Sequence, residues 1–215
     1  MEPQPFEDAV SEHFSFTCSS FQDTKGTLAE ASQQRTLAVI RTSPTTGFYV
    51  DLFRSDSSLP GEYHDYIYRN IGDSLALVSE GSALATTADP GRFQSDIGDD
   101  YEQPGWRYFS DTEVSTATAD GVTATFTADP SGRPTLVMDA HTPAGIAREY
   151  ATVTSPPIVD APAPLDDQDS KAIVVRRNGE AWDKPFLFVF EPSFATASPA
   201  VQSVSSLVRD GVVVG

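Results

Sequence analysis

Hydrophobic and polar residues alternate with a period of two along most of this chain, whereas a helical period of 3.6 is nearly absent. Successive side chains of a β-strand point to opposite faces of a sheet, so this alternation predicts strands. Only residues 26–34 (GTLAEASQQ) suggest a short helix. The pattern predicts an all-β fold, an antiparallel β-sandwich of roughly 10–13 strands with little or no helix. The predicted strands are residues 35–42, 47–55, 63–72, 74–80, 105–111, 113–119, 121–129, 133–141, 148–155, 171–178, 185–193 and 203–209.

Sequences typical of tight turns lie between several of these strands. The dipeptide DG at 120–121 and the sequence DPSG at 129–132 are typical of tight turns or hairpins. A second DG dipeptide, at 210–211, lies between two apolar runs and predicts a hairpin close to the last residue. Because the strand pattern stops inside that hairpin, we expect the chain to be a piece of a longer protein.

Two long stretches separate groups of strands. Residues 86–105 are acidic and rich in glycine and proline, and residues 155–170 contain prolines that favour an extended backbone. Both are expected to be long surface loops, because the strands after the second one are too few for another domain. We therefore predict one β-sandwich domain over residues 1–215, with a poorly assigned lead-in over residues 1–34.

Composition and charge limit the partners. The chain has 215 residues, of which 39% are hydrophobic and 21% are charged, as in globular proteins. Its formal net charge of −17 argues against nucleic acid and against an anionic membrane surface. Cys18 is the single cysteine, so an intrachain disulfide and a cysteine-based zinc cluster are excluded. The first ten residues, MEPQPFEDAV, lack the apolar region of a signal peptide.

One short stretch gathers groups that can exchange protons. Residues 62–72 read EYHDYIYRNIG, which contains one of the three histidines beside an aspartate and several tyrosines. Strand alternation places Tyr66 and Tyr68 on one face and Asp65 on the other. Two interpretations stay open for Tyr66: a residue of a reactive cleft, or an aromatic side chain packed against a neighbouring strand.

Three blocks of sequence resemble the β-sandwich part of heparinase II/III-like polysaccharide lyases. They are FYVDLFRS followed by YHDYIYRNIGDSL, then PGWRYFSD, and then VVRRNGEAWDKPFLFVFEPS followed by VQSVSSLV. The resemblance implies cleavage of a uronic-acid-containing polysaccharide by β-elimination in a secreted or periplasmic protein. It also implies an N-terminal α/α toroid that holds part of the catalytic machinery. No repeated amphipathic helices precede residue 35, so the chain alone is expected to lack activity.

The resemblance assigns catalytic roles to two positions, and the chemistry that it implies adds three candidates for substrate binding. Tyr66 and His64 fall on the tyrosine and histidine of an H-D-Y motif, which implies that they face the cleft as catalytic residues. β-Elimination next to a uronate also needs a cation on the substrate carboxylate. A guanidinium group can bind a carboxylate through two parallel hydrogen bonds. Arg69, Arg54 and Arg35 are therefore the candidates for substrate binding.

Asp51 matches a position that binds a structural zinc in some members of that family. Relatives often carry a second histidine three residues after the H-D-Y tyrosine, whereas this chain has Arg69 there. A site with two imidazoles would need two of His13, His64 and His141 to converge on Asp51. We therefore predict no cofactor and favour a buried carboxylate paired with Arg54 or another arginine.

A function of another class is also consistent with the sequence. The chain could be a non-catalytic carbohydrate-binding or structural β-sandwich module. An exposed planar row of aromatic rings would favour binding, whereas a recessed Tyr66 beside His64 and an arginine would favour the lyase. In either case the expected partner is an acidic polysaccharide or oligosaccharide, with the toroid domain as a second partner of the lyase. The rings that decide between them are Tyr63, Tyr66, Tyr68, Trp106 and Trp182.

Overall fold

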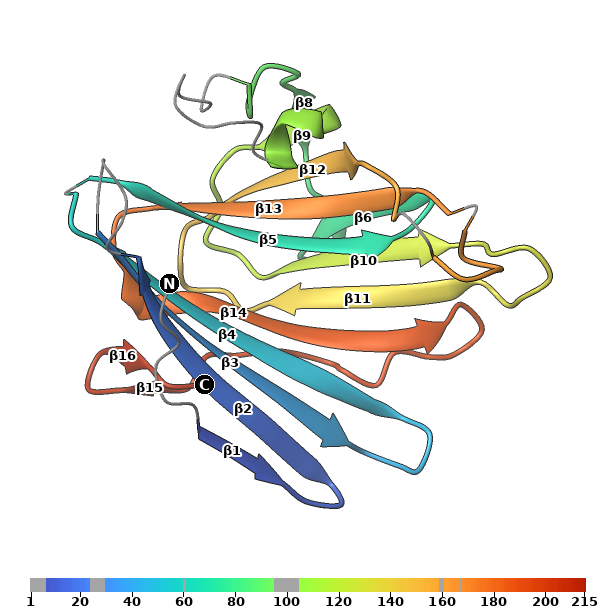
Figure 1. Cartoon of the computed structure of the whole chain (residues 1–215), viewed down its shortest axis with the longest axis horizontal. Coiled ribbons are helices and arrows are strands. Elements are labelled where there is room, and N and C mark those ends of the chain that lie inside the picture. The colour runs from blue at the N-terminus through green and yellow to red at the C-terminus, as the bar shows by residue number, and fades with distance from the viewer. Residues whose placement is uncertain (1–6, 24–29, 60, 95–104, 159–160, 167) are drawn as a thin grey trace.

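Two antiparallel β-sheets packed face to face form the body of the protein (Figure 1). The computed structural model describes residues 7–23, 30–59, 61–94, 105–158, 161–166 and 168–215. The predicted all-β sandwich is confirmed. The described part holds sixteen strands rather than 10–13, because several of them are only two to four residues long.

The larger sheet has nine strands in the order β1-β2-β3-β4-β14-β11-β10-β6-β7. Its neighbours are antiparallel, and sequence-distant strands meet where β14 lies between β4 and β11. The strands are β1 (Glu7–Val10), β2 (Phe14–Asp23), β3 (Ala31–Arg41), β4 (Gly47–Ser57), β6 (Ser74–Ser79), β7 (Ser82–Ala83), β10 (Val122–Ala128), β11 (Leu136–Thr142) and β14 (Ala181–Phe194).

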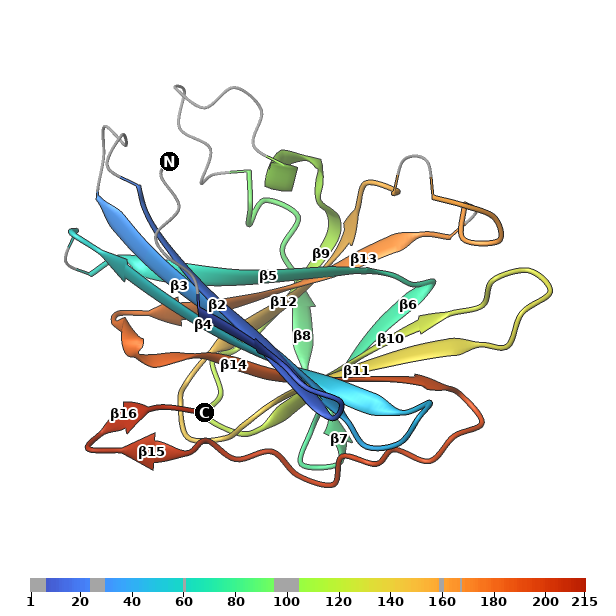
Figure 2. The same ribbon diagram turned by 60° about the horizontal axis from the view of Figure 1, so that its bottom comes forward.

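The smaller sheet has five strands in the order β5-β13-β12-β9-β8. A separate hairpin of β15 and β16 lies beside β14 near the end of the chain (Figure 2). The strands are β5 (Tyr63–Ile71), β8 (Thr86–Ala88), β9 (Ser110–Ser115), β12 (Glu149–Ser155), β13 (Ser170–Asn178), β15 (Val208–Arg209) and β16 (Val212–Val213).

Aromatic rings fill the space between the two sheets. The ring centroids of Tyr66 from β5 and Phe188 from β14 lie 4.4 Å apart, in a stacked arrangement. Phe126, Phe186 and Phe190 are also fully buried in this core. Burying such a side chain stabilises a fold by about 1.5–3 kcal/mol, so the PFLFVF segment of β14 is a main source of cohesion between the sheets.

The lead-in over residues 1–34 is more ordered than the sequence pattern suggested. It contains β1, β2 and the start of β3, which form one edge of the nine-stranded sheet (Figures 1 and 2). The expected helix over residues 26–34 is wrong from Ala31 onward, where β3 begins, and residues 24–29 lie outside the described part. Pairing with β2 and β4 outweighs the weak helical preference of that segment. Leu37 and Val39 on β3 are exposed, so the smaller sheet does not cover this edge.

Three predicted strands differ in the structure. Residues 105–111 begin as the 3-10 helix Gly105–Tyr108, and the predicted strand over residues 113–119 is part of β9, which runs from Ser110 only to Ser115. Of residues 203–209, only Val208–Arg209 is a strand, and its partner is the short β16. Local alternation cannot distinguish an exposed extended segment from a strand that finds a partner, because pairing depends on the rest of the fold.

The predicted turns have different outcomes. Asp210 and Gly211 have φ values of 53° and 82°, which a tight hairpin between β15 and β16 requires, so that prediction is confirmed. Residues 129–132 connect the hairpin partners β10 and β11. Residues 120–121 do not join two paired strands, because β9 and β10 belong to different sheets.

The long stretch over residues 86–105 packs back onto the protein where it is described. The strand β8 extends the smaller sheet, and Phe93, Trp106 and Phe109 cover the outer face of that sheet. They bury Ala151, Val153, Ala172 and Val174 in a second small core. No helix in the described residues is long and apolar enough to cross a membrane.

Candidate functional site

The strand β5 presents the predicted site residues on two opposite faces. Tyr66 and Tyr68 point into the sandwich, as alternation predicted, and both pack against rings of β14. Asp65 and Tyr63 lie on the outer face, where both line a hollow of the surface. The pairing of β5 with β13 is regular over its whole length, so no bulge redirects a side chain from one face to the other.

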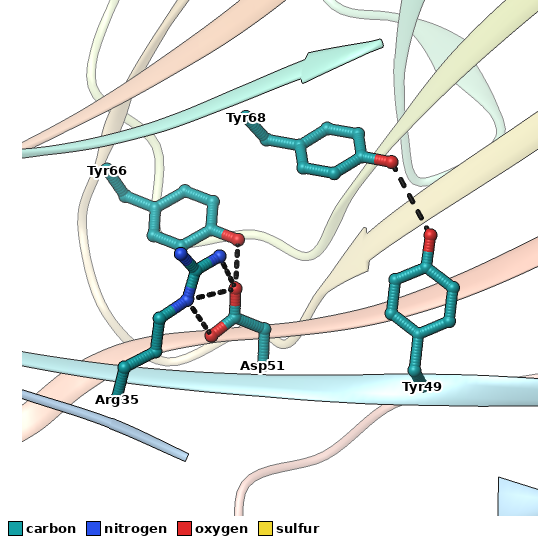
Figure 3. Close-up of polar contacts among 5 residues, drawn as sticks. All are labelled: Arg35, Tyr49, Asp51, Tyr66 and Tyr68. Carbon is teal, nitrogen blue, oxygen red and sulfur yellow. Dashed lines mark hydrogen bonds and ion pairs between the residues drawn. The ribbon is translucent and has the colours of Figure 1, made fainter. Parts of the chain in front are cut away.

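A polar group of three residues crosses the interior between the sheets (Figure 3). The guanidinium of Arg35 on β3 donates from Nε to Asp51 Oδ1 at 3.0 Å and from Nη2 to Oδ2 at 2.5 Å. The phenol of Tyr66 donates to the same Oδ2 at 2.6 Å. We call Arg35, Asp51 and Tyr66 the interior triad. Because Tyr66 belongs to the smaller sheet and the other two to the larger one, the triad ties the two sheets together.

Burial sets the chemistry of the interior triad. Asp51 is 1% exposed and Tyr66 is 3% exposed, whereas the side chain of Arg35 is 46% exposed. Burial, and then the negative charge of Asp51, raise the pKa of Tyr66 far above its ordinary value of 10. The hydrogen bonds to Asp51 raise the pKa of Arg35. A phenol in this setting stays protonated at neutral pH and donates a hydrogen bond, and it is a poor base.

Two further polar contacts join β5 to β4. His64 Nδ1 lies 2.8 Å from Ser55 Oγ, and burial lowers the pKa of His64, so its imidazole is neutral at pH 7. The hydroxyls of Tyr68 and Tyr49 are 3.5 Å apart, and burial raises the pKa of Tyr68 (Figure 3). His64 and Tyr66 therefore share the inner face of β5, and each holds a group of the opposite sheet.

The three arginines predicted to bind substrate each bond to a different part of the protein. Arg35 belongs to the interior triad. Arg54 donates to the carbonyl oxygen of Val213 at 2.6 Å and to that of Trp182, and so fastens the C-terminal hairpin. Arg69 donates from Nε to Ser170 Oγ at 2.7 Å and also to a backbone carbonyl of the loop after β12. The structure does not bring these three guanidinium groups together at one carboxylate.

The surroundings of Asp51 do not fit the zinc site that the resemblance implied. Its oxygens accept hydrogen bonds from the Arg35 guanidinium and the Tyr66 phenol. A cationic side chain therefore already occupies the position that a bound metal ion would need. His64 is bonded to Ser55 instead. The favoured interpretation of Asp51 as a buried carboxylate paired with an arginine agrees with this geometry, and the partner is Arg35 rather than Arg54. Within the described residues, no three His, Cys, Asp or Glu side chains are grouped to hold a metal ion.

A second arginine–carboxylate–tyrosine group lies on the outer face of β5, and no pattern along the chain predicted it. Arg176 on β13 is the register partner of Asp65 and donates to its two oxygens at 2.8 and 2.7 Å. The Arg176 guanidinium carbon also lies 3.5 Å from the centroid of the Tyr63 ring. We call Tyr63, Asp65 and Arg176 the outer triad. The partners are 111 residues apart, so only the strand register unites them.

A hollow of about 240 Å³ opens beside the outer triad. Tyr63, Asp65 and Ile67 from β5 form one wall, and Phe93 and Trp106, which cover the outer face of the smaller sheet, form the other. The five rings considered from the sequence therefore do not form one row. Tyr66 and Tyr68 are internal, and Trp182 is on the other sheet beside Arg54. Tyr63 and Trp106 share the hollow.

Comparison with known proteins adds a functional context. No family model matches this chain. Over 214 residues the chain is 42% identical to an endo-acting ulvan lyase of Formosa agariphila. The match covers 100% of this chain and 25% of the ulvan lyase, so the chain spans about a quarter of the length of the curated relative it matches. Across its whole length, the chain is therefore similar to part of a polysaccharide lyase.

Proposed function

We propose that this chain is the β-sandwich portion of a polysaccharide lyase that cleaves a uronic-acid-containing polysaccharide by β-elimination. The observation that carries the proposal is the 42% identity to an ulvan lyase, which extends over the entire chain. In keeping with the heparinase II/III-like sequence blocks, an α/α toroid outside this chain would supply the rest of the active site. The setting would be secreted or periplasmic, the substrate an acidic polysaccharide or oligosaccharide, and no cofactor is required.

The requirements of β-elimination indicate which groups the toroid would supply. The reaction removes a weakly acidic proton next to a carboxylate, so it requires a cation on that carboxylate, a base, and an acid for the leaving oxygen. Tyr66 is buried and its pKa is raised, so it cannot serve as a base while the sandwich is closed. The net charge of −17 also repels a polyanion. A basic cleft from the toroid would answer both needs.

Arg35 is the member of the interior triad that can reach a substrate. Its side chain is half exposed, and Nε and Nη2 are held by Asp51, which fixes the direction of the guanidinium. Tyr66 in turn holds Asp51. Within the proposal, Arg35 binds the substrate carboxylate, and Asp51 and Tyr66 position it. The roles of Tyr66 and His64 as groups that transfer protons stay predictions of the resemblance.

An assay for unsaturated product tests the proposal. Residues 1–215 and a longer protein that joins them to a toroid domain are incubated with ulvan and other uronate polymers, and the ultraviolet absorbance of the product is followed. We expect turnover by the longer protein and none by residues 1–215. Robust turnover by residues 1–215 alone would refute the divided active site, and an inactive longer protein would refute the lyase function.

Tyr66→Phe in the longer protein separates catalysis from positioning. Loss of a group that transfers a proton lowers kcat by about 10²–10⁴. Loss of a positioning hydroxyl weakens substrate binding through Arg35, so the Michaelis constant rises while kcat falls little. We expect the second pattern. A kcat loss of a hundredfold or more with an unchanged Michaelis constant would show that Tyr66 reacts directly.

A further inference from the structure

We propose that the hollow beside the outer triad is a secondary carbohydrate-binding site that accepts one neutral sugar ring of a polysaccharide. Carbohydrate as the ligand class rests on the proposed function. The site itself rests on the walls, the charge balance and the hydrogen-bonding groups of the hollow. It lies on the face of β5 opposite the interior triad, so it is separate from the residues assigned to substrate chemistry.

The walls suit a sugar ring. Sugar rings carry polarised C–H groups on their faces, and these pack against the electron-rich faces of aromatic rings. Tyr63 is 39% exposed, while Phe93 is buried and Trp106 partly buried on the facing wall. The volume of about 240 Å³ is just below the range of roughly 300–1,000 Å³ that is typical of drug-sized ligands, so the hollow has room for about one ring.

A carboxylate on one wall is ready for hydroxyls. Asp65 already accepts from Arg176, and each of its oxygens keeps a lone pair that can accept from a sugar hydroxyl.

The charge balance selects a neutral ring over a uronate. Asp65 is the one charged residue among the described residues that line the hollow, and Arg176 donates two hydrogen bonds to it. Glu149, the register partner of Arg176 on the next strand, is itself paired with Arg92. A uronate carboxylate in the hollow would meet the negative charge of Asp65, and none of the described lining residues is a cation. The site therefore complements the neutral sugars of a mixed polysaccharide, whereas the proposed cleavage site recognises the uronate.

Electrophoresis of residues 1–215 through gels that contain ulvan tests for binding. We expect retardation relative to a gel without polysaccharide, and we expect it to persist at high salt because ring packing is not screened. Tyr63→Ala removes a wall and should abolish retardation. Trp106→Phe keeps a smaller ring on the facing wall, so it should weaken binding less than Tyr63→Ala does. Trp182→Phe is the matched control and should bind like the parent chain, with all variants checked for folding by circular dichroism.

Tryptophan fluorescence then identifies the kind of sugar. In the Trp182→Phe background Trp106 is the only indole, and its emission is titrated with the methyl glycosides of glucose, galactose, xylose and rhamnose, and with glucuronate. We expect at least one neutral glycoside to shift the emission, with affinity at least tenfold above that for glucuronate. The proposal would be overturned if none of the neutral glycosides shifted the Trp106 emission, or if glucuronate bound as tightly as they do or more tightly. Retardation that Tyr63→Ala leaves unchanged would overturn it as well. Lyase turnover by the longer protein despite that result would leave the proposed function intact.

Discussion

The two faces of β5 carry the same three kinds of side chain in different surroundings. On the inner face, Arg35 binds Asp51 and the Tyr66 phenol donates to that carboxylate. On the outer face, Arg176 binds Asp65 in two-pronged fashion, but its guanidinium lies over the ring of Tyr63. The inner aspartate and tyrosine are 1% and 3% exposed, whereas the outer tyrosine is 39% exposed.

The comparison shows that burial decides what an arginine–aspartate–tyrosine group does. Sealed between two sheets, the phenol must find an acceptor, and the group becomes a crosslink whose loss costs stability. On the outer face the tyrosine ring is partly exposed and lines a hollow, so its surroundings differ although the three residue types are the same. The inner group therefore should matter more for folding than the outer group does.

Arg35→Met is expected to have the largest effect on the free energy of unfolding. It leaves the buried carboxylate of Asp51 without its cation, and removing one partner of a buried pair costs about 3–5 kcal/mol. Because Arg35 is half exposed and water can partly replace it, we expect a loss of about 3 kcal/mol in the free energy of unfolding. Urea denaturation followed by circular dichroism measures it. A loss below about 1 kcal/mol would mean that the interior triad does not hold the sheets together.

Tyr66→Phe should cost less, about 2 kcal/mol, because it removes one hydrogen bond to a charged acceptor. The ring remains and keeps its stacking on Phe188. Tyr49→Phe is the matched control, since its hydroxyl is 3.5 Å from a neutral partner, and we expect a loss of about 1 kcal/mol or less. Equal losses for the two variants, measured by the same urea denaturation, would contradict a special role for the charged acceptor.

Alkaline pH should weaken the sandwich through the same phenol. The pKa of Tyr66 is raised in the folded protein, so above pH 10 the unfolded chain releases a proton that the folded chain keeps. The folded state then binds more protons, and stability falls as pH rises above 10, by up to about 1.4 kcal/mol per pH unit for this one group. Urea denaturation between pH 9 and pH 11, roughly the range around the ordinary tyrosine pKa, measures this effect. The free energy of unfolding should fall less steeply with pH for Tyr66→Phe than for the parent chain.

The smallest effect on stability is expected from Asp65→Asn on the outer face. The Asp65 and Arg176 side chains are 20% and 11% exposed, and the amide oxygen of an asparagine can still accept a hydrogen bond from Arg176. We expect a loss of about 1 kcal/mol, between the values of exposed and buried pairs. A thermal melt checks this, and a loss as large as that of Arg35→Met would erase the distinction between the two faces.

Much of the local structure was predictable from alternation. It placed Tyr66 and Tyr68 on one face of β5 and Asp65 on the other, and the PFLFVF segment supplied the aromatic core. The Asp210-Gly211 hairpin was also predictable, because few residues other than Asn, Asp and Gly tolerate positive φ. By contrast, the strands of the lead-in were missed, since their structure depends on pairing of β1 with β2, of β2 with β3 and of β3 with β4.

The sequence by itself determined the all-β class, the two faces of β5 and the residue types available for chemistry, because these follow from local periodicity and side-chain identity. Only the tertiary structure decided that Asp51 meets Arg35 rather than Arg54, and that Asp65 meets Arg176 across 111 residues. Strand order and register set those pairs, and they result from packing the whole chain into two sheets. Burial, which turns one tyrosine inward as a crosslink and leaves the other beside a hollow, is likewise a property of that packing.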